Sequence, residues 1–250
     1  MMITLNGVAK RFGGVLALND VTVGFERSAV SAIVGPNGSG KTTLLNVVSG
    51  FCRPDRGKVL FDGGVDLLRY APYRRARLGI GRTFQEPRPF LELSVLDNVL
   101  AALPGDADQT AETANADADH VPSLRHGVDG ILRLTDLDSE TAKPAASLSF
   151  GKRKLLDLAR ALVLNPMCLL LDEPFAGVDP RNSRTVISAI ERLRCAGKTI
   201  VMISHEIDIV LSLADQVFLM DEGRLVTSGL PDDVRANRLF ADTFMGTANA

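Results

Sequence analysis

The stretch GPNGSGKTT at residues 35–43 is the feature that most constrains how this chain can fold. It directly follows the apolar run AVSAIV and precedes LLNVVSG, which has a helical pattern. Gly38 and Gly40 let the backbone fold tightly, so that several N–H groups point inward toward an anion. The following helix would add the positive end of its dipole. The sequence therefore predicts a buried strand, a phosphate-binding loop and a helix, in that order.

The residues of this loop have distinct expected roles. The stretch satisfies the pattern G-x-x-x-x-G-K-[ST] through Gly35, Gly40, Lys41 and Thr42. Lys41 is expected to reach the β- and γ-phosphate oxygens, and the Thr42 hydroxyl to ligate Mg²⁺. The predicted nucleotide-binding residues of the loop are Gly35, Pro36, Asn37, Gly38, Ser39, Gly40, Lys41, Thr42 and Thr43. A glycine-rich turn that matches by chance is the alternative, against which the flanking strand and helix argue.

A pair of carboxylates follows a second apolar run. The residues CLLL at 168–171 lead into Asp172 and Glu173. Two adjacent carboxylates at the end of a buried strand are costly unless a cation or a polarised water uses them. We therefore predict that Asp172 belongs to the Mg²⁺ shell and that Glu173 lies beside the γ-phosphate. The alternative is a pair that only caps its strand.

The elements expected along the chain alternate in type. Strands are predicted at 3–9, 19–25, 29–34, 57–61, 167–174 and 198–205, helices at 181–197 and 207–214, and a hairpin at 216–229. Strands that alternate with helices predict a mostly parallel sheet with right-handed crossovers. The region 92–165 reads as helical, with a break at 105–120 that is rich in Ala, Asp and Thr. We expect this break to be a mobile surface segment or an exposed helix; a calcium loop there would lack the required glycine and terminal glutamate.

Composition argues against several other classes of protein. The formal net charge of −2 over 250 residues is unlike that of a general nucleic-acid binder, which needs clustered Lys and Arg. The chain has no uninterrupted apolar run of about 18 residues, so no bilayer-spanning segment is predicted. The N-terminal residues lack the long apolar stretch of a secretion signal. Cys52, Cys168 and Cys195 form no CxxC pair, and we expect reduced thiols, with Cys168 in the core.

The order of these motifs resembles the ATP-binding cassette (ABC) family over almost the whole chain. The motifs are, in order, the phosphate-binding loop, LSFGK at 148–152 and LLLDEP, with His205 further on. The resemblance implies an α/β fold: a P-loop NTPase core with a mixed, mostly parallel sheet, an antiparallel β subdomain and an inserted α-helical subdomain. It also implies a single domain over 1–250. The core would take 1–86 and 166–250, and the helical subdomain 87–165.

The LSFGK stretch matches the family's signature loop, which reads LSGGQ, at three positions. In the family, the Ser and Gly of this loop bind the γ-phosphate of an ATP that the other subunit holds. Ser149 and Gly151 match and are expected to do the same, whereas Phe150 and Lys152 depart from the pattern. Phe150 would have to turn its ring away from the nucleotide, and Lys152 would bring a full positive charge near the phosphates. A plain helix N-cap is the alternative role of Ser149.

The resemblance implies roles for four further residues. Phe12 lies where the family stacks a ring on adenine, with a core Phe as the alternative, and Gln85 lies where the family has a glutamine that contacts Mg²⁺ or the attacking water. Asp179 resembles the loop that touches the opposite subunit; otherwise it caps the helix that begins at Pro180. His205 resembles the switch histidine that hydrogen-bonds the γ-phosphate. The expected catalytic residues are Lys41, Gln85, Glu173 and His205, and the expected Mg²⁺ residues are Thr42, Gln85 and Asp172.

The same resemblance suggests what the ATPase serves. The stretch 76–100, together with KRFGG and with Gly50 and Phe51, is most similar to ATPase subunits of branched-chain amino-acid importers and of their urea and amide relatives. EPFAGVDP at 173–180 also resembles lipopolysaccharide-export ATPases, which are the alternative. A cassette that acts on nucleic acid or ribosomes is a third reading; such proteins commonly carry a second cassette, a long coiled coil or basic arms, and this sequence shows none of these.

The implied cofactors are ATP and Mg²⁺. The implied partners are a second ABC ATPase subunit, identical or paralogous, in an ATP-sandwich dimer, transmembrane permease subunits and, indirectly, a solute-binding protein; no nucleic acid is expected. The permease is expected to dock in a cleft between the core and the helical region, near Gln85. The chain would then lie at the cytoplasmic face of the inner membrane, held there by its permease.

Overall fold

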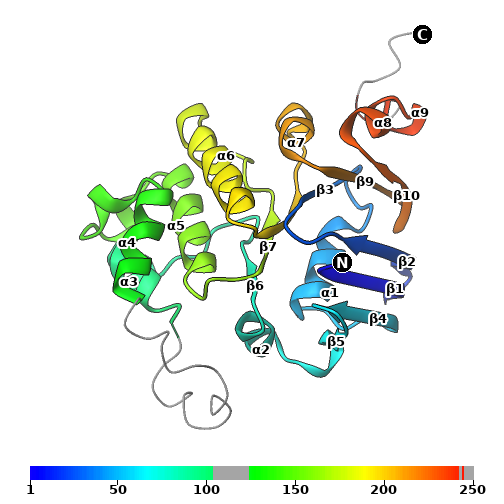
Figure 1. Ribbon diagram of the computed structural model, residues 1–250, viewed down its shortest axis with the longest axis horizontal. Coiled ribbons are helices and arrows are strands. Elements are labelled where there is room, and N and C mark those ends of the chain that lie inside the picture. Colours follow the sequence, from blue (N-terminus) through cyan, green and yellow to red (C-terminus); the bar gives the residue numbers. More distant parts are fainter. Residues whose placement is uncertain (104–123, 242–243, 245–250) are drawn as a thin grey trace.

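The computed structural model describes residues 1–103, 124–241 and 244, and it contains two sheets (Figure 1). The larger sheet has six strands in the order β10-β9-β3-β8-β7-β6. Its strands are β3 (Val30–Val34), β6 (Ile80–Arg82), β7 (Cys168–Asp172), β8 (Thr199–Ile203), β9 (Gln216–Asp221) and β10 (Arg224–Gly229). Strand β10 pairs antiparallel with β9, and the other neighbours pair in parallel. The predicted mixed, mostly parallel sheet is confirmed.

The smaller sheet is antiparallel throughout, as predicted. Its strands are β1 (Ile3–Phe12), β2 (Val15–Phe25), β4 (Arg56–Phe61) and β5 (Val65–Asp66), in the order β2-β1-β4-β5. Strands β1 and β2 are longer than predicted, because their pairing continues from Lys10 opposite Leu18 to Phe12 opposite Val15. Exposed residues at this end hide the alternation of apolar and polar positions on which the prediction relied.

The central parallel strands of the larger sheet are buried on both faces, so this sheet lies between two hydrophobic cores. Every residue of β3, β7 and β8 is buried. In β8, Val201 and Ile203 face a core with α1 (Lys41–Ser49) and the smaller sheet, whereas Ile200 and Met202 face a core with α5 (Phe150–Leu162) and α6 (Pro180–Cys195). Each such side chain stabilises the fold by about 1.5–3 kcal/mol. The loops after β3, β7 and β8 therefore leave a rigid sheet at the same edge.

The region 92–165 is helical only in part. It contains α3 (Val95–Leu100), α4 (Leu124–Leu134) and α5, which gather at one end of the larger sheet in Figure 1, and short 3-10 turns at Asp138–Glu140 and Ala145–Ser147. The continuous pattern breaks because Asp136 takes a positive φ of 53° just after α4 and Pro144 cannot donate a backbone hydrogen bond. The predicted break at 105–120 lies outside the described residues.

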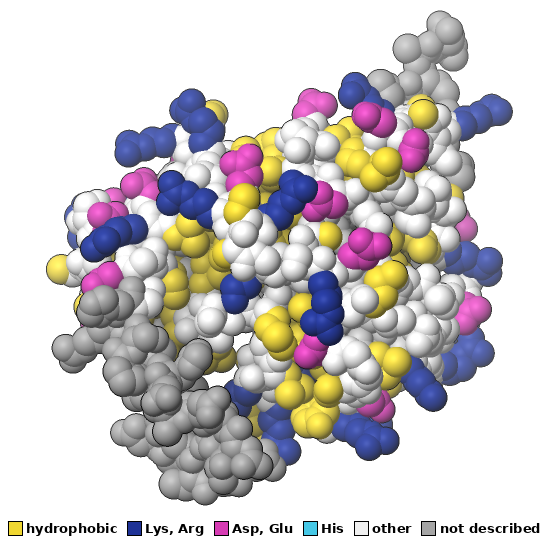
Figure 2. Space-filling model, viewed as in Figure 1, with side chains coloured by type: hydrophobic (Ala, Val, Ile, Leu, Met, Phe, Trp, Pro, Cys, Tyr) yellow, Lys and Arg dark blue, Asp and Glu magenta, His cyan; other side chains and the backbone are white. Residues whose placement is uncertain are grey.

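The other helices of the described residues are short. Helix α2 (Pro72–Arg77), which the sequence analysis did not predict, precedes β6; α7 (Ile207–Leu213), α8 (Pro231–Arg235) and α9 (Arg238–Phe240) follow β8 and β10. No helix in the described part of the chain is long and apolar enough to cross a membrane. All three cysteines are free, and complete burial raises the pKa of Cys168 to about 12, as expected for a core thiol. Acidic and basic side chains are interspersed over the face drawn in Figure 2.

Candidate active site

The loop between β3 and α1 is shaped by its last glycine. Gly40 has a φ of 98°, and a Cβ placed on it would lie 2.3 Å from the carbonyl oxygen of Ala17 in β2. Neither the backbone conformation nor the space admits a side chain there. Gly40 also stands at the N-cap of α1 without a side-chain hydrogen bond, so the first-turn N–H groups of this helix have no side-chain cap. Such an N-terminus suits an anion.

The ammonium of Lys41 is folded back into this loop. Its Nζ donates hydrogen bonds to the carbonyl oxygens of Gly35 and Pro36, both at 2.8 Å, and lies 3.4 Å from the Ser39 hydroxyl. Burial lowers the pKa of Lys41, whereas the nearby Glu173 carboxylate raises it. The loop therefore holds a buried cation at its centre.

One cavity of about 200 Å³ brings most of the predicted site together. It is lined by Ala17, Asn37, Gly38, Gly40, Lys41, Thr42, Thr43, Gln85, Glu173 and His205. Apart from Ala17, each lining residue belongs to the set that the sequence analysis selected. Apart from Ala17, they come from the loops that follow β3, β6, β7 and β8 and from the first turn of α1. These segments are far apart in the sequence, but the strands before them end at the same edge of the sheet.

Glu173 and His205 face each other in this cavity. Glu173 is 5% exposed; its Oε2 accepts the backbone N–H of His205 at 3.2 Å, and its Oε1 lies 3.2 Å from His205 Nε2. Burial raises the pKa of Glu173, and His205 acts in the opposite direction. Glu173 also has a φ of 50°, which costs an L residue roughly 1–2 kcal/mol. The Glu173 N–H bonds to Ile203 O at 3.0 Å and Lys154 Nζ donates to the Glu173 carbonyl, so both neighbours hold this conformation.

Asp172 has one carboxylate oxygen in use and one free. Arg82 Nη2 donates to its Oδ2 at 3.1 Å, and the two side chains are 6% and 2% exposed. Its Oδ1 is buried without a hydrogen-bond partner among the described residues. Burial raises the pKa of Asp172, and Arg82 opposes this shift. A buried, unpartnered carboxylate oxygen fits Mg²⁺, which binds oxygen ligands, and the residues present are therefore suited to such an ion.

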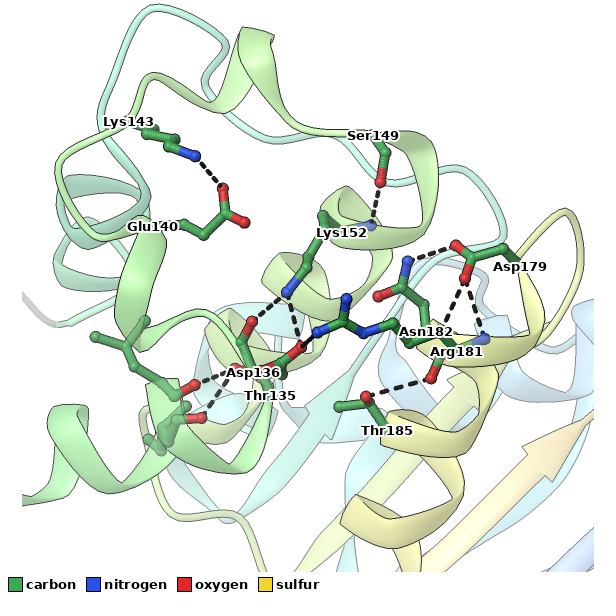
Figure 3. A network of polar contacts seen from close by, with 12 residues as sticks. Thr135, Asp136, Glu140, Lys143, Ser149, Lys152, Asp179, Arg181, Asn182 and Thr185 are labelled. Atoms are coloured by element: carbon green, nitrogen blue, oxygen red, sulfur yellow. Dashed lines mark hydrogen bonds and ion pairs between the residues drawn. The ribbon is translucent and has the colours of Figure 1, made fainter.

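Ser149 and Asp179 lie in a second patch, shown in Figure 3. Ser149 Oγ accepts the backbone N–H of Lys152 at 3.3 Å and caps α5. The Asp179 carboxylate accepts the N–H groups of Arg181 and Asn182, both at 3.1 Å, and caps α6. The hydrogen bonds from Asn182 are the main cause that lowers the pKa of Asp179, and the bond from Arg181 adds to this effect. Both capping alternatives are thus present. Ser149 and Asp179 are exposed, and neither lines the cavity that contains Lys41.

The helix tips in this patch approach each other closely. A Cβ on Gly151 would lie 2.7 Å from Asn182 Nδ2 and 3.1 Å from Asp179 Oδ2. Gly151 therefore lets the N-termini of α5 and α6 meet. The Phe150 ring lies against the loop between β7 and α6, with a ring carbon 3.1 Å from the place where a Cβ on Gly177 would sit.

The ammonium of Lys152 is paired with a carboxylate of its own chain. Its Nζ lies 3.0 Å from Asp136 Oδ2 and also donates to the Asp136 carbonyl (Figure 3). Arg181 Nη2 lies 4.0 Å from the same carboxylate oxygen. The reason is the positive φ of Asp136 at the end of α4, which brings this residue to the start of α5. The sequence analysis did not foresee this pairing, because Asp136 lies 16 positions away in the sequence. That Lys152 brings its charge near the phosphates stays a prediction.

Phe12 lies at the end of β1 and is 52% exposed, which excludes the core alternative. Its ring lies 5.3 Å from Lys10 Nζ, and it is not among the residues that line the 200 Å³ cavity. Stacking of this ring on adenine stays a prediction.

Besides Ala17, two residues at the site were missed by the sequence analysis. Arg82 contacts Asp172, and Lys154 contacts the Glu173 backbone. Lys154 stands in the run KRK, which has the composition of a solvated helix face, and Arg82 ends a strand, where a charged residue usually reaches solvent. The presence of Gln85 three positions later was the one signal that could have drawn attention to Arg82.

Comparison with known proteins shows the class to which this fold and site belong. The family described as ABC transporter matches residues 18–176, and the chain belongs to this family. It is 35% identical over 248 residues to the "Probable branched-chain amino acid transport ATP-binding protein LivG" of Archaeoglobus fulgidus, covering 97% of this chain and 95% of that protein. It is 30% identical over 256 residues to the "High-affinity branched-chain amino acid transport ATP-binding protein LivG" of Escherichia coli, covering 99% and 98%.

Solved structures agree with this assignment. The ADP conformation of MJ1267, an ATP-binding cassette of an ABC transporter, matches with a TM-score of 0.82 and 29% identity over 98% of both chains. The chain is therefore a nucleotide-binding ABC transporter subunit, and ATP hydrolysis is the activity of this family. The ABC resemblance found in the sequence, the fold and the ATPase activity are confirmed.

Proposed function

We propose that this chain binds ATP and Mg²⁺ and uses hydrolysis to drive solute import, of branched-chain amino acids or related amides, through separate permease subunits. The observation that carries the import assignment is the similarity to LivG proteins over 97% and more of the chain. A lipopolysaccharide exporter and a cassette that acts on nucleic acid or ribosomes are the outcomes that would replace it.

The chemistry follows from the cavity. Lys41 and the backbone N–H groups of 35–43 bind the phosphates. Thr42, Gln85 and Asp172 are the candidate residues that would hold Mg²⁺, which would supply neutralisation of the phosphate charge. Glu173 orients the attacking water and accepts its proton, a role that suits a carboxylate whose pKa burial has raised. Lys41 and His205 stabilise the negative charge on the transferring group.

A second copy would complete each site. The exposed tip of α5, with Ser149 and Gly151, is a helix N-terminus that can receive an anion, yet it lies apart from the cavity that contains Lys41. A two-fold dimer would bring this tip to the cavity of the partner, and Asp179 beside it. A cassette of the same fold, MJ0796, has been solved as a dimer. We propose the same head-to-tail arrangement here, with an identical or paralogous partner.

Ser149→Asp should abolish ATP-driven dimerisation while leaving the chain folded. Asp is as good an N-cap as Ser, so α5 keeps its cap, but its carboxylate would face the phosphate of the partner's nucleotide. Sedimentation in the Glu173→Gln background with ATP and Mg²⁺ should show a particle of 26.8 kDa, whereas the parent doubles this mass. Ser147→Asp, an exposed change two positions earlier, should dimerise like the parent. Equal dimerisation of both variants would contradict the shared site.

A groove of about 510 Å³ supports docking of a permease. Its lining includes Arg82, Phe84 and Arg88 from β6 and the segment after it, and Arg160 and Leu164 from α5 and its C-terminal side. It therefore lies between the core and the 87–165 region, which we propose as the helical subdomain, and includes Phe84, the neighbour of Gln85; we propose this groove as the docking cleft of the permease. Binding there would hold the chain at the cytoplasmic face of the inner membrane.

Reconstitution with a permease tests the import assignment. The chain would be purified with the membrane proteins and the solute-binding protein encoded beside it, and ATP hydrolysis measured with leucine, isoleucine, valine, amides and urea. We expect one of these solutes to stimulate hydrolysis several-fold when the binding protein carries it. Stimulation by lipopolysaccharide instead, or recovery of nucleic acid or ribosomes in place of permeases, would overturn import.

A further inference from the structure

The wall of the 510 Å³ groove contains an arginine whose side chain is almost completely buried. Arg82 and Asp172 end neighbouring parallel strands, β6 and β7, and their side chains meet at 3.1 Å. At 6% and 2% exposure this is not a surface ion pair, whose geometry solvent would loosen. The guanidinium is planar and directional, so it sets the orientation of the carboxylate that it holds.

Arg82 also connects Asp172 to the helix of the phosphate-binding loop. Its Nη1 donates to the hydroxyl of Ser49, the last residue of α1, and Lys41 and Thr42 begin the same helix. One guanidinium therefore bridges the two elements that carry the candidate Mg²⁺ residues Thr42 and Asp172. It occupies Asp172 Oδ2 and leaves Oδ1 without a partner among the described residues.

Two aromatic rings that line the groove lie together on one side of this guanidinium. Its central carbon lies 4.9 Å from the centre of the Phe84 ring and 5.5 Å from that of Phe51. The two rings meet edge to face at 5.3 Å, and both line the groove and are partly exposed. Arg82 Nε is buried without a hydrogen-bond partner in the described part of the chain, so the rings and the two Nη contacts are what orient it.

We propose that Arg82 is a positioning residue that orients Asp172 for Mg²⁺, and that Phe51 and Phe84 hold it in place. This inference rests on the proposed role of Asp172 in the metal shell. Residues that orient a metal ligand typically change metal affinity about 10–100-fold when they are replaced. Phe51 and Phe84 line the groove, so a partner bound in the groove would contact the two rings that hold Arg82 beside Asp172.

The test measures metal binding without turnover. The full chain, saturated with ADP, is titrated with Mn²⁺ as the probe, and bound Mn²⁺ is followed by electron paramagnetic resonance. Arg82→Lys keeps the charge but loses the planar fork, and should raise the Mn²⁺ midpoint about tenfold or more. Phe84→Leu and Phe51→Leu should each raise it about threefold, since each removes one ring from the cation. ADP affinity in EDTA should not change in any of these variants.

Phe90→Leu is the matched control for the ring variants. Phe90 is exposed and contacts an arginine through its ring, but that arginine is Arg160, at 5.3 Å. Its Mn²⁺ midpoint should equal that of the parent. An unchanged midpoint in Arg82→Lys would overturn the proposal. If thermal unfolding shows that Arg82→Lys does not fold, Phe84→Leu and Phe51→Leu provide the test instead. Unchanged Mn²⁺ midpoints in both of these variants would overturn the proposal.

Asp172→Asn separates this inference from the proposed function on which it rests. A loss of Mn²⁺ binding in Asp172→Asn with no effect of Arg82→Lys would leave Asp172 in the metal shell and refute only the positioning role. Unchanged Mn²⁺ binding in Asp172→Asn would refute the metal role of Asp172, and the positioning role with it.

Discussion

Glu173→Gln should lower steady-state ATP hydrolysis by about 10²–10⁴-fold while ATP still binds. The amide has nearly the same shape as the carboxylate and can still accept the backbone N–H of His205, which is 3.2 Å away in the parent. It cannot take a proton from the attacking water. Among the described residues, the Glu173 side chain makes no hydrogen bond to the phosphate-binding loop at 35–43, so the nucleotide pocket should keep its form.

The measurement compares turnover with affinity. Phosphate release gives the rate, and a fluorescent ATP analogue gives the dissociation constant, which should stay within about threefold of the parent because the phosphate contacts remain. Glu191→Gln is a suitable control, because Glu191 is exposed on α6. Hydrolysis by Glu173→Gln at the parental rate would remove Glu173 from the catalytic role.

Lys41→Ala should weaken nucleotide binding by at least about 100-fold, since hydrogen bonds to charged groups are worth about 1.5–3 kcal/mol each. Lys41 is 6% exposed, and Ala removes its ammonium from the centre of the loop. The change also leaves the carbonyl oxygens of Gly35 and Pro36 without the donor that they share in the parent. The Pro36 carbonyl keeps the Ser39 N–H at 3.2 Å, whereas the buried Gly35 carbonyl has no other hydrogen bond among the described residues. We therefore expect a loss of stability of about 1–3 kcal/mol.

Urea unfolding measures the loss of stability separately from the loss of nucleotide affinity. Nucleotide binding is compared only at temperatures where Lys41→Ala is folded, and Lys58→Ala, an exposed lysine of β4, serves as control and should bind nucleotide like the parent. Tight ATP binding by a folded Lys41→Ala protein would contradict the assignment of 35–43 as the phosphate-binding loop.

Features that depend on residues close in the sequence were predictable. The loop at 35–43 requires glycine where a Cβ would collide with Ala17, and this requirement is visible as a motif. Strands buried on both faces are visible as apolar runs, and Asp172 and Glu173 stand out because carboxylates rarely end such a run. The meeting of these loops at one edge followed from the parallel order of the strands.

Features that depend on distant pairs were not predictable. The charge of Lys152 is compensated by Asp136, and Arg82 meets Asp172 across 90 positions. The extent of helix in 92–165 was also overestimated, because a positive φ at Asp136 and the turn at Pro144 interrupt a pattern that reads as continuous. In each case the deciding contact lies outside the window in which a periodicity or a motif can be read.

The sequence by itself determined the family, most of the strands and helices in their order, and the residues of the phosphate-binding loop, because these follow from local backbone requirements and from periodic burial. Only the tertiary structure decided where the charges of Lys152 and Arg82 are satisfied, that Asp172 keeps a free buried oxygen, and that Ser149 lies apart from the cavity of its own chain. The physical reason is that the energy of a charge depends on what surrounds it in three dimensions, and neighbours along the chain do not specify those surroundings.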